Sequence, residues 1–235
     1  MKRIILKVSG EALGDANLSK GIDIAKVNET ANEILKLLNS GEYQLGIIVG
    51  GGNIWRGRDA HLSGMDRTHA DYMGMMATVL NARALASSLN KLGVKAKVLS
   101  SFATPISEKY SKELALDLFK QGYVLFFAGG IGLPFFSTDT CAALRALELS
   151  ADVILMAKNG TDGVYDKDPR TNKNAKKFDH ITYNEIIENK LGVMDLTAAT
   201  LCIESGVNIV VFDMNVKGNI ALAAHDSSIG TLITK

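Results

Sequence analysis

The sequence is short of net charge, of cysteine and of long apolar runs, and each shortage excludes a class of protein. Its 235 residues include 26 Lys and Arg against 25 Asp and Glu, a net charge of +1, so neither a basic surface for nucleic acid nor an acidic tail is predicted. No uninterrupted apolar run approaches the length of a membrane span. The apolar run near the N-terminus stops at Lys7. This run is too short for the apolar region of a signal peptide. We therefore expect a cytoplasmic protein without nucleic-acid or membrane partners.

Signatures of metal and nucleotide binding are also scarce. The two cysteines, Cys141 and Cys202, lie far apart without metal-ligand spacing, and we expect both to be small buried apolar side chains. The four histidines form no HxxxH pair, so no metal site built from protein side chains is predicted. The chain has no GxxxxGK[ST] and no GxGxxG motif, which by signature excludes P-loop enzymes and simple dinucleotide-binding proteins.

What the sequence does contain is an alternation of short apolar strands and amphipathic helices along its length. Asp23 is expected to cap a helix with a 3.6-residue apolar period, and Thr138 or Asp139 to cap a helix that runs to about Ser150. The alternation favours an α/β fold with a mostly parallel central sheet sandwiched between helices. No linker or repeat divides the chain, so we predict one domain over residues 1–235. The predicted strands are residues 4–8, 45–49, 94–98, 123–128, 153–157, 207–212 and 231–234, and the predicted helices are residues 24–38, 71–91, 107–121, 138–150, 183–190, 196–205 and 218–225.

Three of these strands end in small-residue loops, at residues 9–10, 50–52 and 129–132. In parallel sheets ligands bind where loops leave the carboxyl ends of the strands, and exposed backbone N–H groups at helix starts attract anions. Three such loops at one edge suggest two phosphorylated ligands. Lys7 and Arg56 add positive charges beside two of the loops. The alternative is that residues 50–52 form only a tight turn with an incidental arginine, and that Lys7 is an ordinary lysine at the end of a strand.

Six short motifs follow one another in order over the whole chain, at residues 7–13, 50–57, 71–75, 134–139, 162–169 and 193–196. Together they resemble the bacterial UMP kinases, or uridylate kinases, of the amino acid kinase superfamily. The resemblance implies an amino acid kinase-like fold and the reversible reaction ATP + UMP → ADP + UDP, with Mg²⁺, on the route to UTP and CTP.

The resemblance also implies which residues hold the phosphoryl donor. The residues after the first strand would hold the phosphates of ATP, and Gly52 and Arg56 would meet both nucleotides. Residues near the fifth strand and the hairpin after it would line the adenine and ribose. The implied ATP-binding residues are Lys7, Val8, Ser9, Gly10, Gly52, Arg56, Asn159, Tyr165 and Asp168.

For the acceptor UMP, the resemblance implies that Asp71 accepts hydrogen bonds from the ribose and that the Thr138 hydroxyl and nearby backbone contact the uracil edge. Asp71 has an alternative role as N-cap of the helix at residues 71–91, and the pair Phe135 and Phe136 has an alternative role as core packing. The implied UMP-binding residues are Gly51, Asp71, Ile131, Gly132, Leu133, Pro134, Phe135, Phe136, Ser137 and Thr138.

Phosphoryl transfer leaves little covalent chemistry to the protein, so catalysis consists of positioning and charge neutralisation. We expect Lys7 and Arg56 to bring the two anionic groups together. Asp139 is the acidic candidate that orients Lys7 or the metal, with a plain N-cap role as the alternative. Lys7, Arg56 and Asp139 are therefore the predicted catalytic residues.

The resemblance further implies a homohexamer that UTP inhibits. Activation by GTP is predicted to be weak or absent, because Ala86 and Lys97 stand where many relatives carry arginine, and because the loop at residues 15–20 differs from the common pattern. The long helix at residues 71–91 carries a methionine-rich apolar side that suits either the core or an interface.

Two other functions compete with UMP phosphorylation. One is a kinase of the same superfamily that phosphorylates a carboxylate or a carbamate. Arg56 and the segment at residues 134–139 argue against it, because a small acid needs no nucleobase pocket. The other is a nucleotide-binding storage or regulatory protein without turnover, and the presence of Lys7, Arg56, Asp71 and Asp139 together argues against that.

Overall fold

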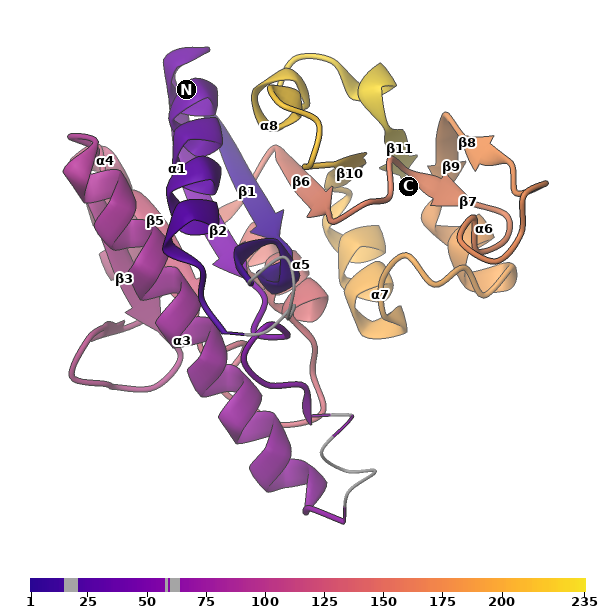
Figure 1. Cartoon of the computed structure of the whole chain (residues 1–235). Helices are drawn as coiled ribbons and strands as arrows, with labels where there is room; N and C mark the ends of the chain where they lie inside the picture. Colours follow the sequence, from indigo (N-terminus) through magenta and orange to yellow (C-terminus); the bar gives the residue numbers. More distant parts are fainter. Residues whose placement is uncertain (15–20, 58, 60–63) are drawn as a thin grey trace.

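The strands form one twisted sheet, whose carboxyl-terminal edge carries the glycine loops. The structure, a computed structural model, describes residues 1–14, 21–57, 59 and 64–235. Among these residues nine strands form a single sheet in the order β4-β3-β5-β2-β1-β6-β10-β11-β9 (Figure 1). Their bounds are β1 (Lys2–Val8), β2 (Tyr43–Val49), β3 (Ala96–Ser100), β4 (Glu108–Lys109), β5 (Val124–Ala128), β6 (Val153–Lys158), β9 (His180–Thr182), β10 (Asn208–Asp213) and β11 (Thr231–Thr234).

The pairing confirms the mostly parallel sheet that the sequence predicts. The central strand β1 runs parallel to β2 and β6, with Lys7 opposite Ile48 on one side and Met156 on the other. Only the pairing of β10 with β11 is antiparallel within the nine-stranded sheet. The carboxyl ends of β5, β2, β1 and β6 therefore lie side by side at one edge.

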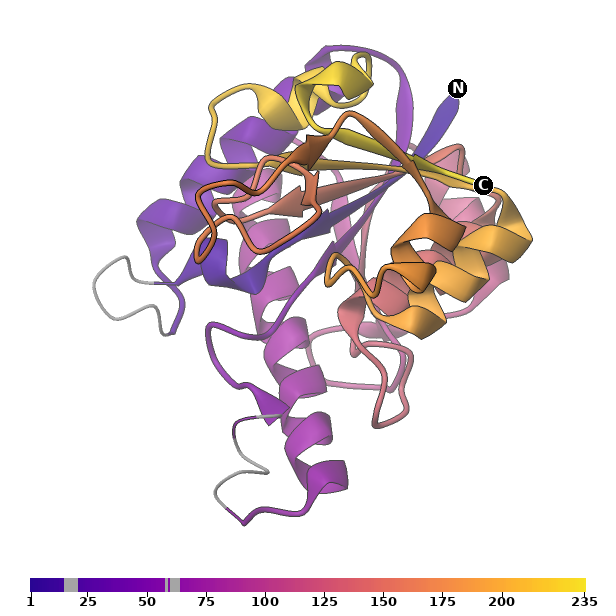
Figure 2. The same ribbon diagram turned by 90° about the vertical axis from the view of Figure 1, so that its right-hand side faces the viewer.

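Helices cover both faces of this sheet (Figure 2). One face packs against α1 (Ile24–Asn39), α3 (Arg67–Lys91) and α8 (Asn219–Leu222), and the amino-terminal part of α3 extends beyond the sheet (Figure 1). The other face packs against α4 (Lys112–Lys120), α5 (Thr138–Leu149), α6 (Tyr183–Glu188) and α7 (Leu196–Ser205). The smaller elements are the 3₁₀ turns η1 (Gly10–Leu13) and η2 (Ser227–Ile229) and a separate antiparallel pair, β7 (Val164–Tyr165) with β8 (Lys177–Phe178).

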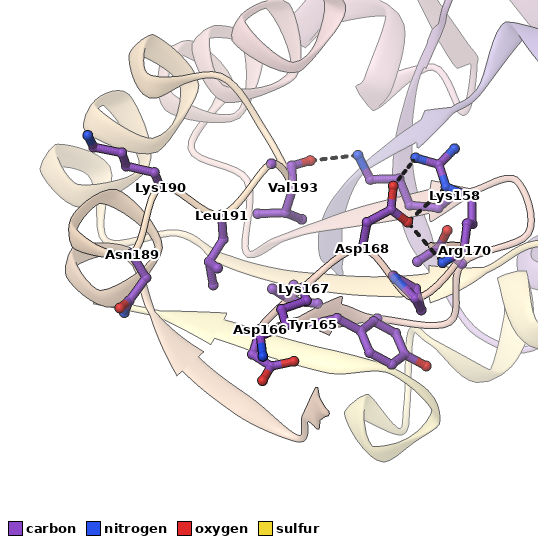
Figure 3. A pocket seen from close by; sticks show the side chains of 15 residues that line it. Lys158, Tyr165, Asp166, Lys167, Asp168, Arg170, Asn189, Lys190, Leu191 and Val193 are labelled. Carbon is purple, nitrogen blue, oxygen red and sulfur yellow. Dashed lines mark hydrogen bonds and ion pairs between the residues drawn. The ribbon is translucent and has the colours of Figure 1, made fainter. Parts of the chain in front are cut away.

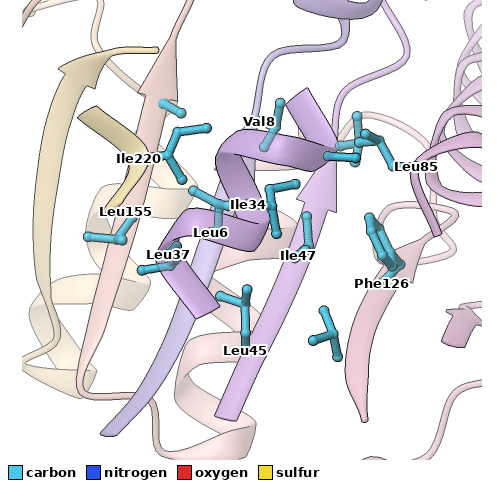
Figure 4. Packing of buried hydrophobic residues seen from close by; sticks show 14 of the residues in the cluster. Leu6, Val8, Ile34, Leu37, Leu45, Ile47, Leu85, Phe126, Leu155 and Ile220 are labelled. Carbon is cyan, nitrogen blue, oxygen red and sulfur yellow. The ribbon is translucent and has the colours of Figure 1, made fainter. Parts of the chain in front are cut away.

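The two hydrophobic layers follow from the two-residue period of the strands. Along β1, the side chains of Ile4, Leu6 and Val8 enter the layer under α1 and α3, as Figure 4 shows for Leu6 and Val8, and Ile5 enters the opposite layer under α5. Lys7 therefore points to the α5 side, at the end of the strand where the apolar layer stops. Because the central strands are buried on both faces, they are almost continuously apolar in sequence.

Several predicted boundaries are confirmed. Asp23 caps α1, with its carboxylate accepting from the backbone N–H groups of Ala25 and Lys26. The bounds of α7 and β11 are those predicted. The hairpin after β6 is also present, with β7 paired in antiparallel fashion to β8.

Three helix starts were predicted wrongly. The helix predicted at residues 107–121 begins only at Lys112 with Ser111 as its cap, because Glu108 and Lys109 pair with β3 as strand β4. Helix α3 begins at Arg67 and is capped by Asp66, so Asp71 lies inside the helix and is not its N-cap. Helix α5 is capped by Ser137 rather than by Thr138 or Asp139.

The predicted apolar side of α3 divides into two parts. Met75, Val79, Leu85 and Leu89 are buried, whereas Tyr72, Met76 and their neighbours Met73 and Leu80 are more than 40% exposed. Within the described residues no helix is both long enough and apolar enough to cross a lipid bilayer.

Candidate functional site

The three glycine loops lie next to one another at the carboxyl edge of the sheet. The backbone N–H of Gly50 donates to the carbonyl of Val8 at 3.0 Å, which joins the loop after β2 to the end of β1. A methyl group at Gly10 would collide with the Gly50 carbonyl, so this close approach requires glycine. The third loop follows β5, the other neighbour of β2. The loops are thus close enough to serve one shared site.

A lysine–aspartate–lysine cluster lies beside these loops. The Nζ atom of Lys7 is 2.8 Å from Oδ1 of Asp139, and the two side chains are only 11% and 15% exposed. Lys158 ends β6 two residues after Met156, the partner of Lys7 in the sheet, so both lysines point to the face that α5 covers. Lys158 donates from Nζ to the Val193 carbonyl at 2.7 Å.

The charges in this cluster shift one another's protonation. Burial alone would raise the pKa of the Asp139 carboxyl, but attraction to Lys7 and Lys158 outweighs it and holds that pKa below its ordinary value. Burial lowers the pKa of Lys158; repulsion from Lys7 adds to this effect, and attraction to Asp139 opposes it. The cluster therefore presents partly dehydrated positive charge with one fixed carboxylate, an arrangement that suits an additional anion.

The cap of α5 leaves Asp139 free for this ion pair. The Ser137 hydroxyl accepts from the backbone N–H groups of Asp139 at 2.9 Å and of Thr140 at 3.2 Å. It also donates to the carboxylate of Asp195, which caps α7 and accepts from the Thr140 hydroxyl at 3.0 Å. Asp195 therefore ties the starts of α5 and α7 together. The alternative role of Asp139 as an N-cap is wrong, because Ser137 fills it.

A cavity of about 430 Å³ opens on the Lys158 side of the cluster (Figure 3). Two of the residues predicted for ATP, Tyr165 and Asp168, line this cavity, and so does Lys158. Asp168 accepts from the guanidinium of Arg170 at 2.9 and 3.0 Å, and the hydrogen bond to Asp162 raises the pKa of Tyr165 to about 12. The lining residues are Lys158, Thr161, Gly163, Val164, Tyr165, Asp166, Lys167, Asp168, Pro169, Arg170, Asn189, Lys190, Leu191, Gly192 and Val193.

Asn159 is not among the lining residues of this cavity. Its side chain is exposed and accepts a hydrogen bond from Asn215 at 2.9 Å. Val8 is fully buried in the core, so only its backbone faces the loops. Ser9 and Gly10 form the start of η1, beside the Gly50 loop.

A smaller cavity of about 150 Å³ lies near the glycine loops after β2 and β5, and Ser137 and Thr138, which directly precede Asp139, line it. It contains five of the residues predicted for UMP, and the other five, residues 131–135, form the chain that leads up to Phe136. The lining residues are Gly51, Trp55, Gly57, Asp71, Gly74, Met75, Thr78, Gly130, Phe136, Ser137 and Thr138.

Asp71 holds the chain segment that borders this cavity. Its carboxylate accepts from the backbone N–H of Phe135 at 2.8 Å and from Nε of Arg67 at 2.8 Å. Phe135 has a left-handed backbone, with φ of 72°, which is unusual for a residue other than glycine. Phe135 and Phe136 are 65% and 44% exposed, so their alternative role as core residues is wrong.

Arg56 reaches toward the loop after β1 instead of projecting freely. It forms an ion pair with Glu11 in η1, and both side chains are about half exposed. Gly52 lies directly beside the arginine stem. Arg56 is therefore at the border between the loops after β1 and β2, where a bound anion would compete with Glu11.

Sequence reasoning assigned no site role to Lys158, Arg67 or Asp195, although Asp195 lies in the last of the six motifs. Lys158 had a visible signal, because it ends a buried apolar strand in the same way as Lys7. Arg67 donates to Asp71 one turn further along the same helix, which is a local i, i+4 pair. The hydrogen bonds of Asp195 join α7 to the start of α5, and that contact depends on the tertiary structure. Among the described residues no group of three His, Cys, Asp or Glu side chains could hold a metal ion.

Comparisons with known proteins place this geometry in context. The model of the amino acid kinase family matches residues 2–213. A uridylate kinase of Streptococcus thermophilus (strain ATCC BAA-491 / LMD-9) is 47% identical over 234 residues, which cover 99% of this chain and 95% of the relative.

Solved structures show the same similarity. The UMP kinase of Ureaplasma parvum superposes with a TM-score of 0.90 at 41% identity, covering 100% of this chain and 99% of the other. The UMP kinase of Bacillus anthracis also gives 0.90, at 35% identity over 99% and 96% of the two chains.

Proposed function

The chain belongs to the amino acid kinase family, and from that premise we propose that it transfers the γ-phosphoryl group of ATP to UMP, giving ADP and UDP. Relatives named as uridylate kinases or UMP kinases match it over nearly its full length. The single observation that supports the reaction in this chain is the position of the Lys7–Asp139–Lys158 cluster. Lys158 lines the larger cavity, and Thr138, next to Asp139, lines the smaller one.

The two cavities suit two different nucleotides. The larger one, of about 430 Å³, has room for an adenosine group between Tyr165 and Leu191. The smaller one has the carboxylate of Asp71 and the hydroxyl of Thr138 at its wall, groups that pair with ribose hydroxyls and with the edge of a pyrimidine. With the donor in the first and the acceptor in the second, the phosphate groups would meet at the cluster.

In the proposed reaction an oxygen of the UMP phosphate forms a bond to the γ-phosphorus while the bond from that phosphorus to the β–γ bridging oxygen breaks. The acceptor oxygen is already anionic, so no strong base is needed. Lys7, Lys158 and Arg56 would neutralise the charge that accumulates on the transferring group and on departing ADP. Asp139 would keep the Lys7 ammonium in place, and backbone N–H groups of the glycine loops would hold the non-bridging oxygens.

Mg²⁺ would add charge neutralisation at the phosphates. Such an ion is commonly bound by one or two carboxylates together with the phosphate oxygens of the substrate. Asp139 is the carboxylate of this chain within the lysine cluster, which fits a cation held chiefly by the nucleotide. Its direct role toward the ion stays a prediction.

Several properties implied by the resemblance stay predictions. The exposed apolar residues Tyr72, Met73, Met76 and Leu80 on α3 support an interface between copies, as a homohexamer requires. Ala86 is fully buried and Lys97 is paired with Glu108 at 2.8 Å, which supports weak or absent activation by GTP. The loop at residues 15–20 lies outside the described residues. Inhibition by UTP, a cytoplasmic location and one domain over residues 1–235 are likewise predictions.

The experiment that tests the proposal is a panel of acceptors with ATP as the donor. Formation of ADP is followed with UMP, CMP, aspartate, glutamate and carbamate, each with and without GTP and UTP. We expect UMP to be the preferred acceptor, with GTP having little effect. Turnover with a carboxylate or carbamate but not with UMP would favour the sister kinases. Binding of ATP without any turnover would favour a non-catalytic protein.

A further inference from the structure

Helix α3 carries buried polar side chains that contact two of the three glycine loops. The Thr78 hydroxyl accepts from the backbone N–H of Gly129 at 2.8 Å and donates to the Met75 carbonyl at 2.7 Å. One turn later, the Asn81 amide donates to the Gly50 carbonyl at 2.7 Å. Thr78 is 4% exposed and Asn81 is fully buried. The two residues are three apart and therefore share one face of the helix.

A second amide completes the attachment to the loop after β2. Asn53 and Asn81 exchange hydrogen bonds through their amide groups, at 2.7 and 3.1 Å, and Asn53 also donates to the Gly21 carbonyl at 2.7 Å. Gly51, in the same loop, packs so close to Gly74 and Ala77 of α3 that a methyl group would not fit. The glycine loop is thus held against the helix by side-chain hydrogen bonds and by direct backbone contact.

Buried polar side chains are costly unless their hydrogen bonds are satisfied, and an apolar helix face would pack against a sheet equally well. Here the polar groups bind backbone atoms in the loops themselves. Gly50 in turn is bonded to the end of β1, so α3 is linked to the loops that follow β1, β2 and β5.

We infer that Thr78 and Asn81 are positioning residues, which set the spacing of the glycine loops and so the alignment of acceptor and donor phosphates. This inference rests on the proposed function. Thr78 acts on the Gly129 loop, which borders the acceptor cavity. Asn81 acts on the Gly50 loop, which lies between the acceptor cavity and the loop after β1.

The test compares Thr78→Val, which removes the hydroxyl at nearly constant shape, with Thr78→Ser, which keeps it. Ser88→Ala is the matched control: Ser88 lies on the same helix, is 7% exposed and donates to Asn28 at 2.8 Å, away from the glycine loops. We expect Thr78→Val to raise the KM for UMP about tenfold, the effect of about 1.4 kcal/mol, with the KM for ATP changed less than about twofold. Thr78→Ser restores most of the loss, and Ser88→Ala lowers thermal stability without changing either KM.

Asn81→Leu tests the contact of α3 with the Gly50 loop separately from the contact of Thr78 with the Gly129 loop. It should lower kcat by about tenfold, because the Gly50 loop that it releases lies between the two sites. If Thr78→Val and Asn81→Leu lose only thermal stability, as Ser88→Ala does, both residues are structural and the inference is wrong.

A readout that does not depend on activity separates this inference from the proposed function. Amide hydrogen exchange at residues 129–132 should be about tenfold faster in Thr78→Val than in the wild type and unchanged in Ser88→Ala. Wild-type protein that does not phosphorylate UMP contradicts the proposed function, whereas unchanged exchange in Thr78→Val contradicts the positioning of the loop.

Discussion

Replacement of Asp139 by asparagine tests the cluster on which the proposed reaction depends. The Lys7–Asp139 pair is mostly buried, with its charged atoms 2.8 Å apart. Asparagine keeps the shape of the side chain but leaves the ammonium groups of Lys7 and Lys158 buried without their shared counter-charge. Removal of one partner from a buried ion pair costs about 3 kcal/mol at the lower end of measured values. For a chain of this length we expect Tm to fall by about 6–12 °C.

The kinetic effect should accompany the loss of stability. Without the carboxylate, Lys7 has no fixed partner to hold it at the phosphates, and we expect kcat to fall by at least about tenfold. Saturating ATP should recover part of the lost Tm, because its phosphates supply negative charge to the same lysines. The assays are thermal unfolding with and without ATP, and steady-state formation of UDP.

Asp117→Asn is the matched control for this substitution. Asp117 forms an ion pair with Lys120 at 3.2 Å on the surface of α4, where the two side chains are 64% and 74% exposed. Breaking this pair should change stability by less than about 1 kcal/mol and leave the rate unchanged. If Asp139→Asn behaves like Asp117→Asn in both assays, the account of the lysine cluster is refuted.

Four further predictions concern individual side chains. Lys7→Ala and Arg56→Ala should each lower turnover by at least about 100-fold, the scale of one lost preorganised donor; near-normal UDP formation by both variants would refute their roles. Lys158→Met should lower kcat by about 100-fold, whereas Lys120→Met, at the exposed end of α4, should leave kcat unchanged; equal rates for the two variants would show that Lys158 takes no part in the reaction. Asn159→Ala should change the KM for ATP by no more than about twofold, because the Asn159 side chain is exposed and pairs with Asn215; a tenfold change would show that Asn159 contributes to ATP binding. The pKa of Asp139 is lowered from its ordinary 3.8, so its stabilising contribution is present above that pH and is lost as the pH falls through the folded-state pKa. The Tm difference between wild type and Asp139→Asn should therefore narrow below about pH 4, and a difference that stays constant there would contradict the ion pair.

Much of the fold could be predicted because strand and helix periods are local. The strand that ends at Lys7 and the helix that follows Asp23 are specified by apolar spacing and by one capping residue. The sequence predicted only that the loops containing Gly10 and Gly50 lie at the same edge of the sheet. Their direct contact depends on the order of the strands, which the local sequence does not specify.

Choices between adjacent residues were less predictable. Ser137, Thr138 and Asp139 are all residue types that favour the N-cap position. The structure uses Ser137, whose hydroxyl also donates to Asp195, a residue far away in the sequence. Glu108 and Lys109 suit a helix locally, but pairing with β3 makes them a strand.

The site residues also differ in how far the sequence alone could identify them. Lys7 and Asp71 lie in motifs that can be recognised directly. Lys158 matters because β6 pairs with β1 and brings the two lysines onto one face, which is a consequence of sheet order. Thr78 and Asn81 are ordinary helix residues by sequence, and only their contacts with Gly129 and Gly50 distinguish them.

The most direct test of the central claim is the affinity of an adenosine–uridine dinucleoside pentaphosphate, which joins donor and acceptor through their phosphates. If the two cavities face each other across Lys7, Asp139 and Lys158, this compound should fill both and bind at least about 100-fold more tightly than ATP in isothermal titration calorimetry. It should also compete with both ATP and UMP. Affinity no higher than that of ATP, or binding that UMP does not displace, would contradict the account.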